Sequence, residues 1–297
     1  MCPLLYLMSG RDDCMSGSVE QDYYENADFW QPDRYVGIVA DRARKTLEML
    51  PSDVTSVLDV GCGNGLLTNQ FPAQTAVVGV DRAMAPLAHV RRPTTQGDIL
   101  SLSFADNSFD AVIATEVIEH IPHFSYQQAL DELARVARRY IVITVPYQEN
   151  RAFTRAICPA CGCRFDPHYH MRSFYRNDLM TLFAGTGDVR PLRVEGIVPV
   201  DHLVGYRETK MLLDEMLHPE RRVPWFAACP QCGHVGNGVD AGPAREQATR
   251  ATGNGPRHGT SSSLAAAKRN LIERWPRLPG FRWWLALYEK QGRTGRE

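Results

Sequence analysis

The sequence lacks long hydrophobic runs, and it lacks an excess of charge of either sign. Its 297 residues include 33 Lys or Arg and 34 Asp or Glu, so the formal net charge is −1. This balance gives no overall basic surface for nucleic acid. No apolar segment approaches the roughly 20 residues that a membrane-spanning helix needs. The apolar patch at residues 3–8 is not preceded by the basic residues of a secretory signal. We therefore expect a globular protein that is cytoplasmic by default.

The sequence also lacks the cysteine pattern of a small disulfide-rich protein. Four of its eight cysteines form two copies of Cys-Pro-x-Cys-Gly, at residues 158–162 and 229–233. Two such turns supply four thiolates, which is the donor set of a closed, structural zinc site. Other possible metal donors nearby are Cys163, His168, His170 and His234. In an alternative ligand set, one of them replaces a thiolate. The predicted zinc ligands are Cys158, Cys161, Cys229 and Cys232.

Short apolar strands alternate with helical patterns along most of the chain, which predicts an α/β fold with a doubly wound parallel sheet. The apolar run at 281–288 is predicted as a last strand, because continuous apolar residues suit a strand covered on both faces. An amphipathic helix on a membrane or partner is the alternative for this run. Strands are expected at 56–60, 76–80, 109–115, 140–145 and 189–198, with a strand-like approach to Gly97, and helices at 39–50, 66–71, 84–90, 125–138, 173–183 and 203–218.

Composition divides the chain into five expected regions. The stretch at 236–263 is rich in Gly, Ala and Ser and nearly free of large apolar residues, which predicts a flexible loop. The regions are a helical lid at 1–50, a cofactor-binding core at 51–150, a zinc-knuckle insertion with the remaining core elements at 151–235, the loop at 236–263, and a C-terminal helix with the last strand at 264–297.

Two features near the chain ends each have two interpretations. The aromatic residues Tyr23, Tyr24, Phe29 and Trp30 either close a lid over a site or pack within a helix. Residues 264–297 carry eight basic against three acidic residues. These charges form either a solvated face or a surface for an anionic acceptor.

A glycine cluster follows the first predicted strand. Gly61, Gly63 and Gly65 let the backbone pass close to a ligand. The dinucleotide fingerprint of dehydrogenases needs a further glycine where Leu66 stands, which disfavours that class. Asp81 closes the next predicted strand, where a carboxylate accepts hydrogen bonds from ribose hydroxyls. The pattern predicts recognition of a nucleoside.

Four motifs in this order resemble class I S-adenosylmethionine-dependent methyltransferases of the type 11 group: residues 57–65, 80–81, 97–99 and 109–121. The resemblance implies a Rossmann-like seven-stranded sheet whose antiparallel last strand lies between the fifth and sixth. It also implies that the glycine cluster lines the methionine end of S-adenosylmethionine, that Asp59 orients its amino group and that Asp81 holds its ribose. Asp98 and Ile99 would frame the adenine. Glu116, at the end of a predicted strand, either meets the cofactor or the substrate, or caps a helix or remains solvated. The cofactor residues expected are Asp59, Gly61, Gly63, Gly65, Asp81, Arg82, Asp98, Ile99 and Glu116.

The expected sheet order puts both cysteine turns in connections at the cofactor edge, so that they can meet. This arrangement, with the run at 170–174, is similar to zinc-ribbon-bearing methyltransferases of glycan modification. The resemblance implies O-methylation of a sugar hydroxyl in a glycan or glycosylated metabolite. The alternatives are a methyltransferase that grips RNA or protein through its zinc ribbon, and a binding protein without catalysis. Nucleic acid is disfavoured by the charge but not excluded, peripheral membrane contact is open, and the oligomeric state is not predicted.

Methyl transfer to a hydroxyl requires a positioned nucleophile and removal of its proton. Histidine suits this task near neutral pH. His120, His123, His168 and His170 are all expected in loops at the cofactor edge. We predict His170 as the first candidate base and His120 as the second.

Overall fold

The computed structural model describes residues 24–26, 30, 37–149, 155–186, 188–203, 227–235 and 277–291. The chain divides into two compact units. The core unit comprises Glu20–Arg151, Tyr169–Val200 and Gly280–Glu297. The cysteine unit comprises Met1–Val19, Ala152–His168 and Asp201–Pro279.

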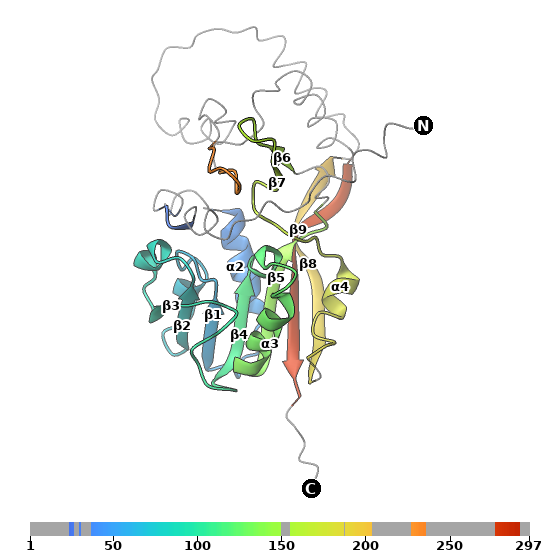
Figure 1. Cartoon of the computed structure of the whole chain (residues 1–297). Helices are drawn as coiled ribbons and strands as arrows, with labels where there is room; N and C mark the ends of the chain where they lie inside the picture. Colours follow the sequence, from blue (N-terminus) through green and yellow to red (C-terminus); the bar gives the residue numbers. More distant parts are fainter. Residues whose placement is uncertain are drawn as a thin grey trace, which may run out of the picture. The chain divides into compact units, whose positions relative to one another are not determined.

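The core unit is built on a seven-stranded sheet with the order β3-β2-β1-β4-β5-β9-β8 (Figure 1). Strands β1 to β5 are parallel to one another, and β9 pairs antiparallel with β5. The last strand therefore lies between the fifth and sixth strands of the predicted set, and the Rossmann-like class I methyltransferase fold is confirmed. The strands are β1 (Ser56–Val60), β2 (Ala76–Asp81), β3 (Thr94–Gln96), β4 (Phe109–Thr115), β5 (Ala137–Pro146), β8 (Val189–Leu203) and β9 (Arg277–Lys290).

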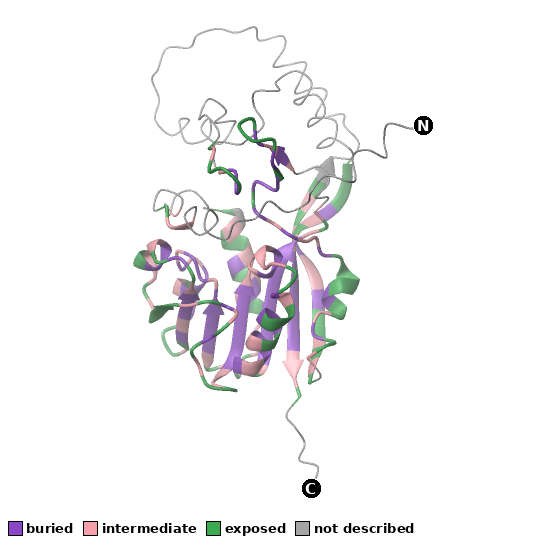
Figure 2. Cartoon of the chain, in the orientation of Figure 1, coloured by how far each residue is buried: buried purple, intermediate pink, exposed green. Residues whose placement is uncertain are grey.

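The central strands are buried on both faces, which explains their uninterrupted apolar sequences (Figure 2). Neighbouring residues on a strand point to opposite faces. Leu58 and Val112 accordingly join one hydrophobic cluster, and Val57 and Ile113 join the other. Both faces of the sheet are therefore covered, as a doubly wound fold requires.

The helices that cover the sheet come from three segments. Helix α2 (Ile38–Met49) ends just before Pro51, as the sequence predicts, and its Met49 packs with the Val57 cluster. Helix α3 (Tyr126–Val136) buries Leu130 and Leu133 in the opposite cluster. Helix α4 (Arg176–Met180) buries Leu179 in the same cluster as α3.

Three predicted helices are shorter than the sequence suggested. The helix expected at 66–71 is the single 3₁₀ turn η4 (Thr68–Gln70), because the glycine turn and Pro72 leave too few residues to nucleate an α-helix. The helix expected at 84–90 is the 3₁₀ turn η5 (Ala85–His89). The helix expected at 173–183 begins only at Arg176, because Phe174 forms a β-bridge with Tyr147.

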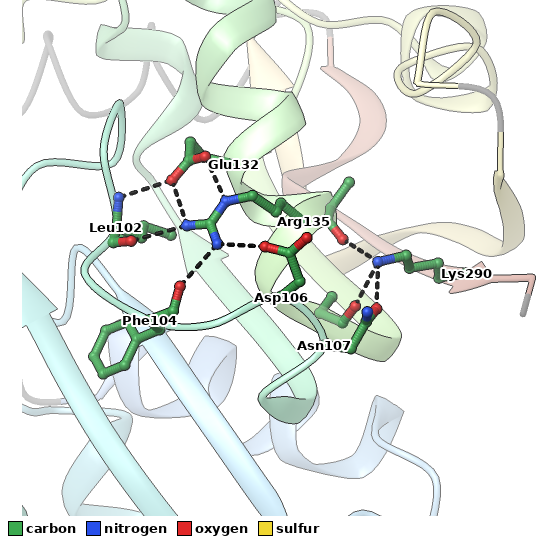
Figure 3. A network of polar contacts seen from close by, with 9 residues as sticks. Leu102, Phe104, Asp106, Asn107, Glu132, Arg135 and Lys290 are labelled. Atoms are coloured by element: carbon green, nitrogen blue, oxygen red, sulfur yellow. Dashed lines mark hydrogen bonds and ion pairs between the residues drawn. The ribbon is translucent and has the colours of Figure 1, made fainter.

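A polar network connects α3 and β9 to the segment that leads into β4 (Figure 3). The Arg135 guanidinium donates to the carbonyl oxygens of Leu102 and Phe104, each at 2.8 Å. From β9, the Lys290 ammonium donates to the Asn107 side chain at 2.6 Å and to the Ala134 and Ala137 carbonyl oxygens at 2.7 and 2.9 Å. These contacts hold the amino end of β4 and so help to set its position in the sheet.

The cysteine unit contains a two-stranded antiparallel sheet of β6 (Ala156–Ile157) and β7 (Arg164–Phe165) around the first cysteine turn. The bridge between Ala228 and Val235 flanks the second turn in the same way. Several predictions fall outside the described residues: the helix at 203–218, except its first residue, the loop at 236–263, the C-terminal helix, and the positions of Tyr23 and Phe29. Within the described part of the chain, no helix has the length and apolar character needed to cross a membrane.

Candidate functional site

The glycine turn after β1 has the backbone conformation that the sequence motif requires. Gly61, Gly63 and Gly65 have φ angles of 71, 52 and 76°, a region that favours glycine. The Gly61 amide donates to the Val80 carbonyl oxygen at 2.7 Å, which fixes the turn against β2. A Cβ atom on Gly61 would lie 2.3 Å from Val117, so the turn also passes close to the segment that follows β4. The turn is thus a compact cradle at the carboxyl ends of β1, β2 and β4.

Asp59 lies at the end of β1, beneath this cradle. Its side chain is 1 % exposed, and its Oδ2 accepts a hydrogen bond from the Thr68 hydroxyl at 2.6 Å. Its Oδ1 has no hydrogen-bond partner among the described residues. Burial raises the pKa of Asp59 to about 7. A buried carboxylate oxygen without a donor suits a ligand amino group, the role predicted for Asp59.

Asp81 lies at the end of β2, as predicted for a ribose-binding carboxylate. It accepts hydrogen bonds from the Gly63 amide at 2.8 Å and from the Ala83 amide at 2.9 Å. Each carboxylate oxygen retains a second lone pair, so both can still accept from ribose hydroxyls. Burial raises the pKa of Asp81, and the two amide donors oppose that shift. Arg82, the next residue, is exposed, and its carbonyl oxygen accepts from Gln96 at 2.9 Å.

The two residues predicted to frame an adenine follow β3. Asp98 is exposed, and its carboxylate accepts from the Leu100 amide at 2.9 Å. Ile99 is buried, with 7 % of its side chain exposed, and packs in the same cluster as Val80. The turn at 98–101, closed by a Ser101 amide to Asp98 bond of 3.0 Å, therefore presents one polar and one apolar group.

Glu116 ends β4 in a strained backbone conformation, with φ at 57°. Its carboxylate accepts from the Trp283 indole at 2.7 Å and from the Thr144 hydroxyl at 3.2 Å, and it pairs with Arg42 at 3.3 Å. Burial raises the pKa of Glu116, while Arg42 and His170 oppose the shift. Glu116 is thus held by β5, β9 and α2, which is a more constrained position than the solvated alternative.

Three side chains after β4 and before α4 form a compact cluster, which we call the Glu–His cluster. It comprises Glu119 and His120, in the 3₁₀ turn η6 (Ile118–His120), and His170. One possible ligand atom from each lies within 4.8 Å of those of the other two. The His170 Nδ1 lies 2.5 Å from the Glu149 carboxylate. The two predicted base candidates are therefore neighbours, with ring centroids 4.8 Å apart.

The Glu119 carboxylate is the group in this cluster that the sequence analysis missed. It is fully buried, and burial, together with the nearby Glu116 carboxylate, raises its pKa well above the ordinary value. The signal was present, because Glu119 precedes His120 directly, but a single sequence cannot show that a carboxylate after a strand end turns inward. Glu149 was missed for the same reason.

Two aromatic residues connect the glycine turn to the Glu–His cluster. The Trp30 ring lies over Gly63, where an added Cβ would approach it to 2.8 Å. The Tyr24 ring lies 6.1 Å from Trp30 and 6.1 Å from His120, centroid to centroid. These residues therefore pack against the site, which is the place that the lid interpretation assigns them.

In the cysteine unit the four predicted metal ligands come together. The Sγ atoms of Cys158 and Cys232 lie 3.6 Å apart, as do those of Cys161 and Cys229, and all four lie within 4.8 Å of one another. A disulfide would need about 2.05 Å. Four sulfurs at about 2.3 Å from a tetrahedral zinc lie about 3.8 Å apart, so the set fits that ion.

Both cysteine turns have the same backbone design. The amide of the glycine after the second cysteine donates to the carbonyl of the first at 2.8 Å, in Gly162 and in Gly233. These glycines have φ angles of 74 and 71°. Among the described residues, Cys163, His168 and His234 do not belong to the four-thiol group. His168 belongs to this unit.

Comparison with known proteins matches residues 58–141 to the methyltransferase domain family. The chain is 32% identical over 88 residues to the ubiquinone biosynthesis O-methyltransferase of Bartonella quintana, covering 26% of this chain and 36% of that protein. It is 35% identical over 135 residues to the demethylmenaquinone methyltransferase of Corynebacterium efficiens, covering 44% of this chain and 54% of that protein. The chain thus spans between about a third and about half of the length of these relatives.

Among solved structures, a chain of the complex that contains the Haloferax volcanii Trm112 methyltransferase activator has a similar fold. The TM-score is 0.50 at 14% identity, with 93% of this chain and 98% of that chain covered. This likeness concerns the fold alone. Residues 58–141 therefore form a domain that matches the methyltransferase family, within a sheet of class I methyltransferase strand order.

Proposed function

We propose that the chain is an S-adenosylmethionine-dependent methyltransferase that methylates a hydroxyl group of a sugar in a glycan or glycosylated metabolite. The observation that carries the donor assignment is the pair of carboxylates, Asp59 and Asp81, on either side of the positive-φ glycine turn. An oxygen acceptor is supported by similarity to a relative whose name describes an O-methyltransferase.

The residues at the carboxyl ends of β1 to β4 fit this cofactor. Asp59 offers the buried Oδ1 to its amino group, Asp81 offers free lone pairs to its ribose, and the turn at 98–101 would meet its adenine. When bound, the cofactor supplies a methyl group on a positively charged sulfur, which reacts by in-line displacement. The protein has to hold an acceptor oxygen in line with that methyl group and exclude water.

The Glu–His cluster is the part of the site that we assign to the acceptor hydroxyl. It lies next to the cradle, because Val117, three residues before His120, contacts Gly61. Its two imidazoles and its buried carboxylate suit binding a hydroxyl and favouring the loss of its proton. We infer that a sugar carries this hydroxyl because the cysteine turns resemble those of glycan-modifying methyltransferases.

The test of donor and acceptor uses S-adenosylmethionine with a labelled methyl group in a host-cell extract, fractionated into small metabolites, glycans, nucleic acid and protein. We expect label in a glycan or glycosylated metabolite, and none with Asp81→Ala. Asp131→Ala, on the exposed face of α3, is the matched control and should retain transfer. Label in RNA or protein would overturn the sugar acceptor. Calorimetry that detects no cofactor binding to the wild type would overturn the methyltransferase itself.

We also propose that the four-thiol group holds one structural zinc ion. Four thiolates leave no coordination position for substrate, so the ion would stabilise the cysteine unit rather than take part in transfer. Metal analysis of freshly purified protein should find zinc that is lost when Cys158→Ser and Cys229→Ser are combined. Cys163→Ser, adjacent in sequence but outside the four-thiol group, should retain it. Wild-type protein without zinc would contradict the assignment.

A further inference from the structure

The Glu119 carboxylate is buried without a hydrogen-bond partner in the part of the chain that the structure describes. Its side chain is 0 % exposed, and neither Oε1 nor Oε2 has a hydrogen-bond partner among the described residues. Buried carboxylates in folded proteins are normally hydrogen-bonded, paired with a cation or coordinated to a metal. Two unsatisfied oxygens on one buried group therefore point to a ligand that completes them.

Two imidazoles lie beside this carboxylate. One ring nitrogen each from His120 and His170 and a Glu119 oxygen lie within 4.8 Å of one another. His120 comes from the turn η6 and His170 from the segment before α4, and the Met171 amide joins these segments through a 2.7 Å bond to the Glu119 carbonyl oxygen. The backbone thus holds the three donors together before any ligand arrives.

A second carboxylate orients one of the imidazoles. Glu149 lies 2.5 Å from Nδ1 of His170, so Nε2 is the ring nitrogen that would bind a ligand in the Glu–His cluster. A histidine that binds a metal through one nitrogen commonly donates its other N–H to a carboxylate, which fixes the ring and its tautomer. The His170–Glu149 pair has this arrangement.

The charge around the cluster also favours a cation. Glu116, Glu119 and Glu149 all lie near His170, and Arg42 pairs with Glu116. Carboxylates this close repel one another in a buried site. A divalent cation would remove this repulsion and satisfy the Glu119 oxygens together.

We propose that Glu119, His120 and His170 bind a divalent cation through one carboxylate and two imidazoles, and that this cation holds the acceptor hydroxyl for methylation. The inference rests on the proposed function for its catalytic part and on the described residues for its metal part. Nitrogen and oxygen ligands suit manganese, magnesium, iron or zinc, whereas the four thiols of the cysteine unit are soft ligands. Three protein ligands leave coordination positions open for a substrate oxygen.

The arrangement supports a direct displacement at the methyl group of the cofactor. The cation lowers the pKa of the hydroxyl bound to it, whose proton passes to water. The oxygen then forms a bond to the methyl carbon while the carbon–sulfur bond breaks, and that electron pair stays on sulfur. His170 is in this proposal a ligand, and not the base predicted from the sequence.

Manganese is the probe, because Mn²⁺ prefers oxygen and nitrogen ligands to thiolates. Titration of the full chain, followed by loss of the electron paramagnetic resonance signal of free Mn²⁺, should show one bound ion per chain. We expect Glu119→Gln and His170→Gln each to weaken binding at least tenfold. Glu149→Gln should weaken it about 10-fold, since it orients His170 without touching the ion. His89→Gln, outside the cluster, and Cys158→Ser, in the cysteine unit, should bind Mn²⁺ as the wild type does.

Each other outcome decides against the metal site. Wild-type protein that binds no Mn²⁺, or binding that Glu119→Gln and His170→Gln leave unchanged, would overturn it. His120→Gln provides a third variant if either of these fails to fold, as judged by circular dichroism. S-adenosylmethionine binding, measured by calorimetry without added metal, separates the two proposals. Cofactor binding without Mn²⁺ binding would leave the methyltransferase assignment intact and remove the metal site.

Discussion

At the amino ends of β1 and β4 Asp110 is fully satisfied, whereas at the carboxyl ends of the same strands Asp59 and Glu119 keep buried oxygens without partners among the described residues. Asp110 accepts from the Thr55 amide at 3.0 Å, the Thr55 hydroxyl at 2.7 Å and the Ser56 amide at 3.1 Å, and it pairs with Arg138 at 2.7 Å. Asp110 thus has its hydrogen bonds closed within the protein, whereas Asp59 and Glu119 leave oxygens for a ligand.

The pKa shifts of the two ends run in opposite directions. Burial disfavours ionisation of Asp110, but the hydrogen bonds from Thr55 and Ser56 outweigh it and lower its pKa. Burial of Asp59 is opposed mainly by one hydroxyl donor, and its pKa is raised. This difference indicates that the ionised Asp110 stabilises the amino end of the sheet. The buried Asp59 at the carboxyl end lowers stability and leaves an oxygen for a ligand.

The largest expected effect on stability comes from a substitution at the amino end of the sheet. Asp110→Ala leaves the Thr55 and Ser56 donors without their acceptor and should lower the free energy of unfolding by about 4 kcal/mol. Urea unfolding followed by circular dichroism measures it. Asp131→Ala, on the exposed face of α3, should change the value by less than about 0.5 kcal/mol. A loss of similar size in both variants would mean that the contacts of Asp110 are not what holds this end.

Asp59→Asn should have the opposite effect on stability. The amide oxygen can still accept from Thr68, while the buried charge is removed, so the free energy of unfolding at pH 8 should rise by about 2 kcal/mol. Calorimetry should show S-adenosylmethionine affinity reduced about tenfold or more, because a charge-assisted hydrogen bond is lost. The exposed Asp53→Asn, in an ion pair with Arg139, is the control. Lower stability together with unchanged affinity would reverse our interpretation of the carboxyl end.

The pH dependence of stability should separate the two aspartates. The folded-state pKa of Asp59 is about 7 against an ordinary 3.8, so its contribution is greatest below about pH 4 and is lost as the pH rises toward 7. Asp110 has a lowered folded-state pKa, so its contribution is present at neutral pH and is lost as the pH falls below about 4. Each group changes stability by at most about 1.4 kcal/mol per pH unit. Urea unfolding from pH 8 to 3 measures the free energy of unfolding at each pH. Compared with the wild type, this free energy should change less above pH 4 in Asp59→Asn and less below pH 4 in Asp110→Ala.

The smallest expected effect compares glycines with the same backbone conformation. At Gly63 a new Cβ would meet Trp30 at 2.8 Å, whereas at Gly162 it meets nothing within 4 Å. Gly162→Ala should therefore destabilise the protein by about 1 kcal/mol from backbone strain alone. Gly63→Ala should add a further fraction of a kcal/mol and weaken cofactor binding, as thermal unfolding and calorimetry would record. Equal effects on cofactor binding would show that the glycine turn is not a ligand cradle.

Much of the fold followed from local patterns. The strands at 56–60 and 109–115 and the helix that ends before Pro51 are confirmed. Burial on both faces requires continuous apolar residues, and a proline stops a helix, so both features can be recognised in the sequence. The prediction that the apolar run at 281–288 is the last strand, between the fifth and sixth, is confirmed as well. The short turns η4 and η5 were predicted too long, and for η4 the reason is that the glycine turn and Pro72 leave too few residues to nucleate an α-helix.

The sequence by itself determined the pieces that are built within a few residues: the glycine turn with its positive φ angles, Asp81 at a strand end, and two cysteine turns of the same design. Their conformations depend on the residues themselves, so their spacing is informative. Only the tertiary structure decided that Glu119, His120 and His170 form one cluster, that Glu149 orients His170, and that Asp59 keeps an oxygen without a partner among the described residues. These properties depend on burial and on contacts between distant segments, which a spacing pattern does not record.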